Sequence, residues 1–412
     1  MRYVIVGACI AGISAAKAIW SGDPGASIEI VSDEKAKPYY RPMIPFLIKK
    51  EDIDITFEND LLGKKSVTLV YDRATGIDTG TKGVTLASGK KLSYDKLLLA
   101  TGSRPVVPDI PGMKGAGVFT FRKRDEALEI RAYARGRKKA LVIGGGLIGL
   151  KAAIALKELG LEVTVVEKLP QILLQRLDRK GASVISDVIR KSGISIVTGD
   201  SVSEIIREAG NLRAARLSSG LLVESEMVIV AVGTKPDLGL LKDTGIKGNK
   251  GILINESLQT SVPGIYAAGD VVEYNDLSTG MPAVSGLWTN AEEMGRLAGK
   301  NMAGGNSKYS GFLSVLNSTE FLGVPVMSIG LIEPEEKEYE IITEDNIGSY
   351  RKLVFKGDLL VGAVFIGEVA NAGIYTNLIR NKIPIGGLKE EAIKGNLGYI
   401  HFLKSPPPTI TV

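Results

Sequence analysis

The strongest constraint on the fold of this chain is a short motif that occurs twice. Residues 4–12 read Val-Ile-Val-Gly-Ala-Cys-Ile-Ala-Gly, and residues 141–149 read Leu-Val-Ile-Gly-Gly-Gly-Leu-Ile-Gly. Each copy joins an apolar, strand-like run to a glycine turn and then to a helical pattern. The copies lie about 137 residues apart, which is too long for a solenoid repeat and fits one domain duplicated or inserted after another.

The sequence around each copy alternates between short β-branched runs and helical patterns, which is typical of doubly wound α/β domains with a parallel sheet. The predicted strands are residues 3–6, 27–31 and 96–99 in the first unit, and residues 140–143, 162–166, 195–197 and 227–230 in the second. Two such units predict two nucleotide-sized pockets.

The pattern changes from about Ser314 onward. The predicted elements are strands at residues 324–329, 339–342, 350–355 and 359–366, followed by a helix at residues 371–381. Alternating polar and apolar residues in such strands favour an antiparallel sheet, so we predict a small C-terminal α+β domain.

The composition excludes several kinds of site. Among 412 residues there is one cysteine, Cys9, and one histidine, His401. One thiol cannot form an intramolecular disulfide, a CxxC redox pair, a Cys-ligated iron–sulfur cluster or the usual Cys/His zinc site, so we expect no metal site. Redox chemistry must then use carboxylates, amines, the backbone or a bound organic cofactor.

Charge and hydropathy address partners and location. The net charge of +5 is small for this length and argues against a nucleic-acid partner. No apolar stretch approaches the roughly 18 residues that span a bilayer, and no signal-peptide pattern follows Met1. We therefore expect a soluble cytoplasmic protein with no membrane span.

The second copy of the motif has the full context of a dinucleotide fingerprint. Gly144, Gly146 and Gly149 follow a predicted strand and open a helical pattern, and Glu167 ends the next strand. Such glycines let the backbone approach a pyrophosphate at the helix N-terminus, and the carboxylate takes the ribose hydroxyls. Glu167 would repel a 2′-phosphate and favours NADH, although the basic residues Lys168, Arg176 and Arg179 keep NADPH open.

The first copy, with Gly7 and Gly12, has Cys9 in place of the middle glycine. Cysteine is small enough for this position, and we interpret Cys9 as a buried spacer beside the pyrophosphate. Asp33, within Ser32-Asp33-Glu34, lies 21 residues after Gly12 and supplies a carboxylate suited to a ribose; the alternative is a solvated turn residue.

Two later segments point to a family. Leu97-Leu98-Leu99-Ala100-Thr101-Gly102-Ser103-Arg104-Pro105 is a strand that ends in a tight turn, and Thr260-Ser261-Val262-Pro263-Gly264-Ile265-Tyr266-Ala267-Ala268-Gly269-Asp270 ends on a glycine and a carboxylate. With the two glycine motifs, these segments resemble the pyridine nucleotide–disulfide oxidoreductases, flavoproteins with two dinucleotide-binding domains. The resemblance covers essentially the whole chain.

The resemblance implies two Rossmann-like domains, one for FAD and one for NAD, and roles for single residues. The domains would be residues 1–112 with 240–313 for FAD, 113–239 for NAD(P)H, and 314–412 as a C-terminal interface domain. Asp270 would bind the FAD ribityl chain. The turn at Gly233 would close the NAD domain. The remaining residues expected to contact FAD are Thr101, Gly102, Ala74, Arg122 and Trp288.

The branch of the family follows from the segment at residues 37–45. It reads Lys-Pro-Tyr-Tyr-Arg-Pro-Met-Ile-Pro and lacks the redox cysteine of disulfide-reducing members. It is similar to rubredoxin reductases and to the flavin domain of NAD(P)H nitrite reductases, in which a basic residue at the place of Arg41 approaches the flavin. Lys151 stands where the family commonly has Glu; it would either add a second cation near the flavin or turn away to another partner.

We therefore predict an FAD-dependent NAD(P)H oxidoreductase, with Arg41 and Lys151 as its catalytic residues. It would exchange hydride between NAD(H) and FAD and single electrons between FAD and an iron–sulfur protein, either a free rubredoxin-like or ferredoxin-like carrier or a subunit of a larger complex. The C-terminal domain would mediate a homodimer or a hetero-oligomer. Two alternatives stay open: a peroxide-forming NADH oxidase, and a flavin-bound sensor or assembly protein like apoptosis-inducing factor.

Overall fold

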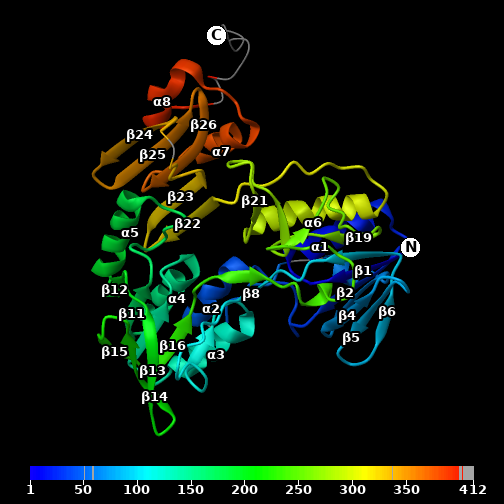
Figure 1. The fold of residues 1–412 in the computed structure, drawn as a ribbon, viewed down its shortest axis with the longest axis horizontal. Coiled ribbons are helices and arrows are strands. Elements are labelled where there is room, and N and C mark those ends of the chain that lie inside the picture. The colour runs from blue at the N-terminus through cyan, green and yellow to red at the C-terminus, as the bar shows by residue number, and fades with distance from the viewer. Residues whose placement is uncertain (51, 58–59, 336, 399–400, 402–412) are drawn as a thin grey trace. The chain divides into compact units, whose positions relative to one another are not determined.

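A computed structural model describes residues 1–50, 52–57, 60–335, 337–398 and 401. The chain forms two compact units, shown in Figure 1. The first comprises Met1–Lys168, Ile194–Asp276 and Met281–Phe312, and the second comprises Leu169–Gly193, Leu277–Gly280 and Leu313–Val412. The finer boundaries predicted for an FAD domain and an NAD domain stay a prediction.

The first unit contains two parallel five-stranded sheets. One has the order β19-β7-β1-β2-β3 and the other the order β12-β11-β10-β16-β9. The strands of the first are β1 (Arg2–Val6), β2 (Ser27–Ser32), β3 (Val67–Tyr71), β7 (Lys96–Leu99) and β19 (Ile265–Ala267). Those of the second are β9 (Val118–Thr120), β10 (Lys139–Ile143), β11 (Glu162–Glu167), β12 (Ser195–Thr198) and β16 (Met227–Val230).

These bounds confirm the seven strands predicted for the α/β units to within one residue. The sequence repeat also extends to whole sheets, because β1 and β10 are the central strands and each leads into its glycine turn. The fifth strand differs in origin: β9 precedes its sheet in the chain, whereas β19 comes from far downstream. Strands buried on both faces, such as β1 and β10, read as continuous apolar runs.

Smaller antiparallel elements and helices complete the first unit. The antiparallel strands are β4 (Ala74–Asp78), β5 (Gly83–Leu86), β6 (Lys91–Ser93), β8 (Ser103–Pro105), β13 (Val202–Glu208), β14 (Asn211–Leu217), β15 (Leu222–Glu224), β17 (Thr234–Pro236), β20 (Val272–Asn275) and β21 (Pro282–Val284), with β18 (Ile252–Leu253) parallel to β20. The helices are α1 (Ile10–Gly22), α2 (Ile44–Lys49), α3 (Arg124–Ala134), α4 (Leu147–Glu158) and α6 (Trp288–Met302), with short 3-10 turns η1 (Arg41–Met43), η2 (Asp60–Gly63) and η3 (Gly239–Leu241).

The second unit holds one antiparallel sheet of order β22-β23-β26-β25-β24, drawn in yellow and orange in Figure 1. Its elements are α5 (Arg179–Lys191), β22 (Leu316–Phe321), β23 (Val324–Gly330), β24 (Tyr339–Asn346), β25 (Ser349–Lys356), β26 (Leu359–Ile366), α7 (Ala372–Asn381), η4 (Gly386–Leu388) and α8 (Lys389–Ile393). Leu353, Phe365 and Tyr375 lie in its apolar core. The predicted α+β domain is thereby confirmed.

A buried polar cluster joins α5 to this sheet. Asp178, the N-cap of α5, accepts hydrogen bonds from the Tyr350 hydroxyl at 2.6 Å and from the backbone N of Gly181 at 3.2 Å. The Lys352 ammonium lies 3.5 Å from Asp178 and 2.6 Å from Glu333. Paired in this way, a buried lysine and a buried carboxylate avoid the large cost of an isolated charge.

None of the described helices is long and apolar enough to cross a membrane.

Helices α1 and α6 lie side by side in the first unit (Figure 1). A Cβ atom added to Gly295 would lie 2.1 Å from the carbonyl oxygen of Ala11, and one added to Gly299 would lie 2.3 Å from that of Ala15. Real Cβ contacts are never this short, so the two helices approach backbone to backbone only because these positions are glycine.

We predict that Gly299→Ala lowers the free energy of unfolding by about 1–3 kcal/mol, because the added methyl forces α1 and α6 apart. Gly373→Ala is the matched control: Gly373 is also helical, and a Cβ there meets no atom within 4 Å. The control should be stabilising by up to about 1 kcal/mol. Urea unfolding of both variants measures the difference, and equal effects would contradict the close approach.

Candidate functional site

The two glycine loops of the first unit share one backbone geometry. Gly7 and Gly144 have φ values of 121° and 111°, in the region that favours glycine. A Cβ atom at Gly7 would lie 2.1 Å from the carbonyl oxygen of Ala100, and one at Gly144 would lie 2.3 Å from that of Ala231; each alanine directly follows the neighbouring strand. At Gly12 and Gly149 it would lie 1.9 or 2.0 Å from the carbonyl of the first loop glycine. All four positions therefore require glycine.

The middle position of each loop has a different requirement. Cys9 (φ −87°, ψ −171°) and Gly146 (φ −79°, ψ −179°) are both extended N-cap residues of the following helix. A Cβ atom at Gly146 would meet no protein atom within 4 Å. The backbone thus tolerates a side chain here, and open space borders the helix N-terminus where a pyrophosphate binds. This geometry fits a dinucleotide in each loop.

Glu167 closes the second loop. It is the last residue of β11, and its Oε2 atom accepts a hydrogen bond of 2.6 Å from the backbone N of Gly145. The backbone N of Gly144 in turn donates to the carbonyl of Val166 at 2.8 Å. The carboxylate therefore lies at the glycine turn, as the spacing predicts for a ribose-binding residue.

The first loop places its carboxylates differently. Gly7 N donates to the carbonyl of Val31, so the position equivalent to Glu167 is Ser32. Asp33, the predicted ribose carboxylate, has a side chain 51% exposed and forms a 2.8 Å ion pair with Lys123.

Glu34, one residue further, has a side chain only 14% exposed. It accepts a 2.5 Å hydrogen bond from the Tyr39 hydroxyl and forms an ion pair with Arg41. Glu34 is therefore more firmly oriented than Asp33. The Ser-Asp-Glu run named both carboxylates, but spacing alone could not rank them.

Arg41, in η1, connects several predicted residues. Its Nε atom donates to Cys9 Sγ at 3.2 Å, and its Nη1 atom donates to the carbonyl of Arg122 at 3.0 Å. Burial alone would lower the pKa of Arg41, but Cys9, Tyr39 and Glu34 together outweigh it and raise that pKa. Arg41 is thus a permanent cation beside the first glycine loop.

Arg122 and Asp270 form a second part of the same cluster. Arg122 Nη2 lies 3.4 Å from Asp270 Oδ2, which also accepts a 3.1 Å hydrogen bond from Ser103 Oγ. Gly102 has φ 70°, and a Cβ atom there would lie 3.1 Å from Arg122 Nη2. The structure thereby brings Cys9, Arg41, Arg122, Gly102 and Asp270 together from separate segments.

Thr101 and Gly233 lie at the two chain crossings between the sheets. Thr101 Oγ1 donates to the carbonyl of Asp237 at 3.0 Å, and the Gly233 carbonyl accepts from Val106 N at 3.0 Å. Strands β8 and β17, which follow these residues, pair antiparallel. Backbone and side-chain hydrogen bonds therefore join the two chain crossings directly.

Trp288 begins α6 and lies in an aromatic cluster. Its ring centroid is 5.5 Å from Tyr40 and 6.1 Å from Phe57, within the range of favourable aromatic pairs. Ala74, at the start of β4, is half-buried against the same core. Among the described residues, Ala74 forms no hydrogen bond or ion pair with the Arg41 cluster.

Lys151 lies on the first turns of α4 and is partly exposed. Of the basic residues that kept NADPH open, Arg176 donates to the Ser314 carbonyl at 2.9 Å, and burial lowers its pKa. Arg176 is thus committed to a structural contact. Lys168, next to Glu167, is exposed.

Sequence reasoning missed two members of the cluster, Tyr39 and Ser103, and it named Glu34 without ranking it above Asp33. Tyr39 and Ser103 lie inside motifs already singled out, two residues before Arg41 and directly after Gly102. Their proximity to a predicted residue was the available signal, but a hydroxyl partner depends on how distant segments meet.

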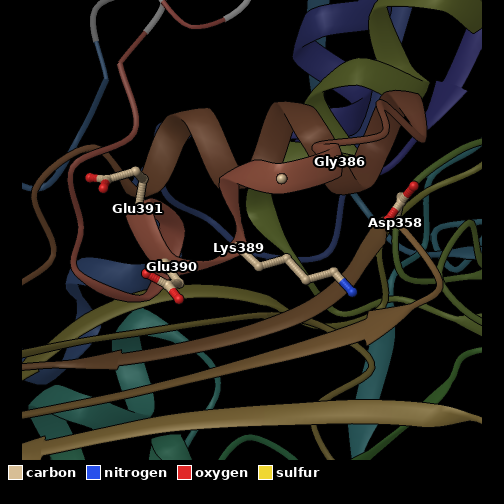
Figure 2. A pocket seen from close by; sticks show the side chains of 6 residues that line it. Asp358, Gly386, Lys389, Glu390 and Glu391 are labelled. Atoms are coloured by element: carbon tan, nitrogen blue, oxygen red, sulfur yellow. The ribbon is translucent and has the colours of Figure 1, made fainter.

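The second unit carries a shallow pocket lined by Asp358, Gly386, Gly387, Lys389, Glu390 and Glu391 (Figure 2). Lys389 is already bonded to Glu340 at 2.6 Å. None of the predicted site residues lines this pocket.

Two parallel sheets, each with a glycine loop shaped for a pyrophosphate, define a two-dinucleotide-binding protein. Residues 1–295 match the family "Pyridine nucleotide-disulphide oxidoreductase", and residues 316–383 match "Rubredoxin NAD+ reductase C-terminal domain". The chain therefore belongs to the pyridine nucleotide-disulphide oxidoreductase family, which confirms the predicted resemblance. It is an oxidoreductase that uses FAD and NAD(P)H.

Three relatives are similar over most of this chain. NADH-rubredoxin oxidoreductase from Clostridium acetobutylicum is 32% identical over 90% of this chain and 92% of the relative. Subunit epsilon of NADH-dependent phenylglyoxylate dehydrogenase from Aromatoleum evansii is 29% identical over 96% and 95%. Nitrite reductase [NAD(P)H] from Bacillus subtilis is 32% identical over 93% of this chain, which spans only 48% of that relative.

A solved structure agrees with these matches. The crystal structure of NADH:rubredoxin oxidoreductase from Clostridium acetobutylicum superposes with a TM-score of 0.80 at 32% identity, over 96% of this chain and 99% of the other. The fold of two Rossmann-like regions and a C-terminal antiparallel domain is thereby confirmed.

We predict that Cys9→Ala retains FAD and that Gly12→Ala loses it. The first change removes one hydrogen bond from Arg41, worth about 1 kcal/mol, which the protein makes without FAD, so the FAD dissociation constant should rise by no more than about fivefold. The second puts a methyl against the Gly7 carbonyl. Flavin absorbance of the purified variants measures retention; loss of FAD from Cys9→Ala alone would contradict the spacer role.

We predict that the enzyme prefers NADH and that Glu167→Ala lowers the ratio of kcat/KM for NADH to that for NADPH by about tenfold or more. Glu167 lies at the glycine turn; if it binds the ribose, the change removes a charged hydrogen bond to NADH and the repulsion of a 2′-phosphate. Steady-state kcat/KM for NADH and NADPH measures the ratio. An unchanged ratio would contradict the assignment of Glu167 to the ribose.

Proposed function

We propose that this chain exchanges hydride between NAD(H) and FAD and passes single electrons between FAD and an iron–sulfur protein. One observation carries the proposal: both dinucleotide loops are present, but there is only one thiol, Cys9, whose sulfur accepts a hydrogen bond from Arg41 at 3.2 Å in the first loop. Cys9 is partly exposed, so the predicted full burial of this residue is wrong. Electrons therefore leave the flavin without a protein disulfide. Bound FAD supplies the conversion between two-electron and one-electron transfer.

The first loop and its cluster would hold FAD. Gly7, Cys9 and Gly12 would admit the pyrophosphate, and Glu34 would take ribose hydroxyls in preference to Asp33 because its carboxylate is buried and oriented. Asp270, fixed by Ser103 and Arg122, would accept hydrogen bonds from the ribityl chain. Thr101, Gly102, Ala74 and Trp288 complete the proposed FAD set.

The second loop would hold NAD(H). Gly144, Gly146 and Gly149 would cradle its pyrophosphate and Glu167 its ribose, with Gly233 at the closing turn. The role of Lys151 beside the flavin stays a prediction, because the family's usual carboxylate is replaced here by a cation.

The contacts of Arg41 favour a binding role. Its guanidinium touches the N-cap of α1 and the carboxylate of Glu34, which are the pyrophosphate and ribose ends of the proposed FAD site. A fixed cation there neutralises pyrophosphate charge. The predicted catalytic approach of Arg41 to the flavin ring stays a prediction.

The proposed partner is an iron–sulfur protein, supported by the near full-length similarity to an NADH-rubredoxin oxidoreductase and the matching C-terminal domain. The similarity to a dehydrogenase subunit supports the same electron exchange inside a larger complex. Oligomerisation through the C-terminal domain and a cytoplasmic location stay predictions.

We predict that NADH reduces the bound flavin and that a purified rubredoxin or ferredoxin reoxidises it much faster than air-saturated buffer does. Stopped-flow flavin absorbance, with the acceptor's own visible spectrum as a second signal, measures both rates. Wild-type protein mixed with acceptor but no NADH is the control. Fast reoxidation by oxygen with peroxide formation would favour the oxidase alternative, and a long-lived NADH-reduced state with no acceptor turnover would favour the sensor alternative.

A further inference from the structure

One short segment links two halves of the first unit: the half that carries the first glycine loop, residues 7–12, and the half that carries the second, residues 144–149. Three consecutive residues, 122–124, lie between β9 and the start of α3, and each is contacted from the segment 33–41. Arg41 donates to the Arg122 carbonyl at 3.0 Å, and Asp33 pairs with Lys123 at 2.8 Å. The Tyr39 hydroxyl accepts from Arg124 N at 3.1 Å.

The hydrogen bond from Arg124 N to the Tyr39 hydroxyl satisfies a backbone amide at the start of a helix. Arg124 is the first residue of α3, so its backbone N–H has no partner within the helix. Glu126 satisfies the preceding amides of Arg122 and Lys123, at 2.6 and 2.8 Å. Tyr39, far away in sequence, supplies the acceptor for the amide of Arg124.

The same hydroxyl faces the other half. It donates to Glu34 at 2.5 Å, the carboxylate that also binds Arg41, and Arg41 in turn contacts Cys9 in the first glycine loop. Burial raises the pKa of Tyr39, and Glu34 adds to this rise, so the hydroxyl keeps its proton and remains a donor. The hydroxyl can therefore donate a hydrogen bond to Glu34, in the first half, while it accepts one from the backbone N of Arg124, in the second.

A second contact continues the connection along α2. Arg131, on α3, donates to the carbonyls of Ile48 and Lys49 at the end of α2, at 2.7 and 2.6 Å. Lys49 also pairs with Glu158 of α4 at 2.7 Å. The segment 33–49 is thus tied to the second half at both of its ends.

We propose that Tyr39 is a positioning residue for hydride transfer: through Glu34 and the first turn of α3, it holds the two dinucleotide loops in the alignment that brings nicotinamide and flavin together. The inference rests on the proposed function. Rate constants for such transfers are sensitive to alignment, since a displacement of about 1 Å can cost up to about a hundredfold.

The test compares Tyr39→Phe with wild type as FAD-loaded protein. We expect the rate constant for flavin reduction at saturating NADH to fall about tenfold, together with the long-wavelength charge-transfer absorbance. FAD content should not change, because the ion pair with Arg41 still orients Glu34. The flavin reduction potential should not change either, nor should the dissociation constant for ADP-ribose, which on FAD-loaded protein would occupy only the second loop. This pattern separates alignment from binding and from general stability.

Two further variants sharpen the test. Tyr94→Phe is the control, because the Tyr94 ring is buried and its hydroxyl makes no hydrogen bond among the described residues; it should leave the reduction rate unchanged. Arg131→Met removes the second tie, remote from Tyr39, and should lower the rate in the same selective way.

Several outcomes would overturn the positioning role. They are an unchanged reduction rate in Tyr39→Phe, or a slower rate accompanied by lost FAD or weaker ADP-ribose binding. A slower rate in Tyr94→Phe of equal size would do the same. Failure of the wild-type flavin to be reduced by NADH would instead refute the proposed function, so the two failures are distinguishable.

Discussion

Close backbone contact between a glycine turn and the helix that follows it organises both halves of the first unit. The fingerprint glycines at positions 12 and 149 lie directly against the carbonyl oxygens of Gly7 and Gly144, which brings each helix N-terminus to the carboxyl edge of its sheet. At the second loop a Cβ atom on Gly146 would meet no protein atom within 4 Å, so open space borders the helix N-terminus there. A side chain at either contact would move the helix and close the cradle.

Charged side chains then fix the orientation of the groups around the first glycine loop. Arg41 is half-buried among Cys9, Glu34 and the Arg122 carbonyl, so its partial desolvation is compensated by contacts from three separate segments. The neighbouring Arg122–Asp270 pair follows the same logic. Such a cluster orients carboxylates before any ligand arrives, which lowers the entropic cost of binding.

Local patterns were enough to predict most of the fold. The apolar runs of β1 and β10 and the glycine spacing after them depend on neighbours in sequence, and their bounds agreed to within one residue. The short edge strand β9 escaped prediction, because only pairing with the distant strand β16 stabilises it. For the same reason Asp33 was chosen as the ribose carboxylate, although burial and partners favour Glu34.

The sequence by itself determined the class of protein: two dinucleotide loops, and one cysteine placed where it cannot serve as a redox pair. Only the tertiary structure decided which side chains act together. Tyr39 and Arg124 are 85 residues apart, and Arg122 and Asp270 are 148 apart. Hydrogen bonds of this kind depend on distances of about 3 Å between chain segments, which no local pattern encodes.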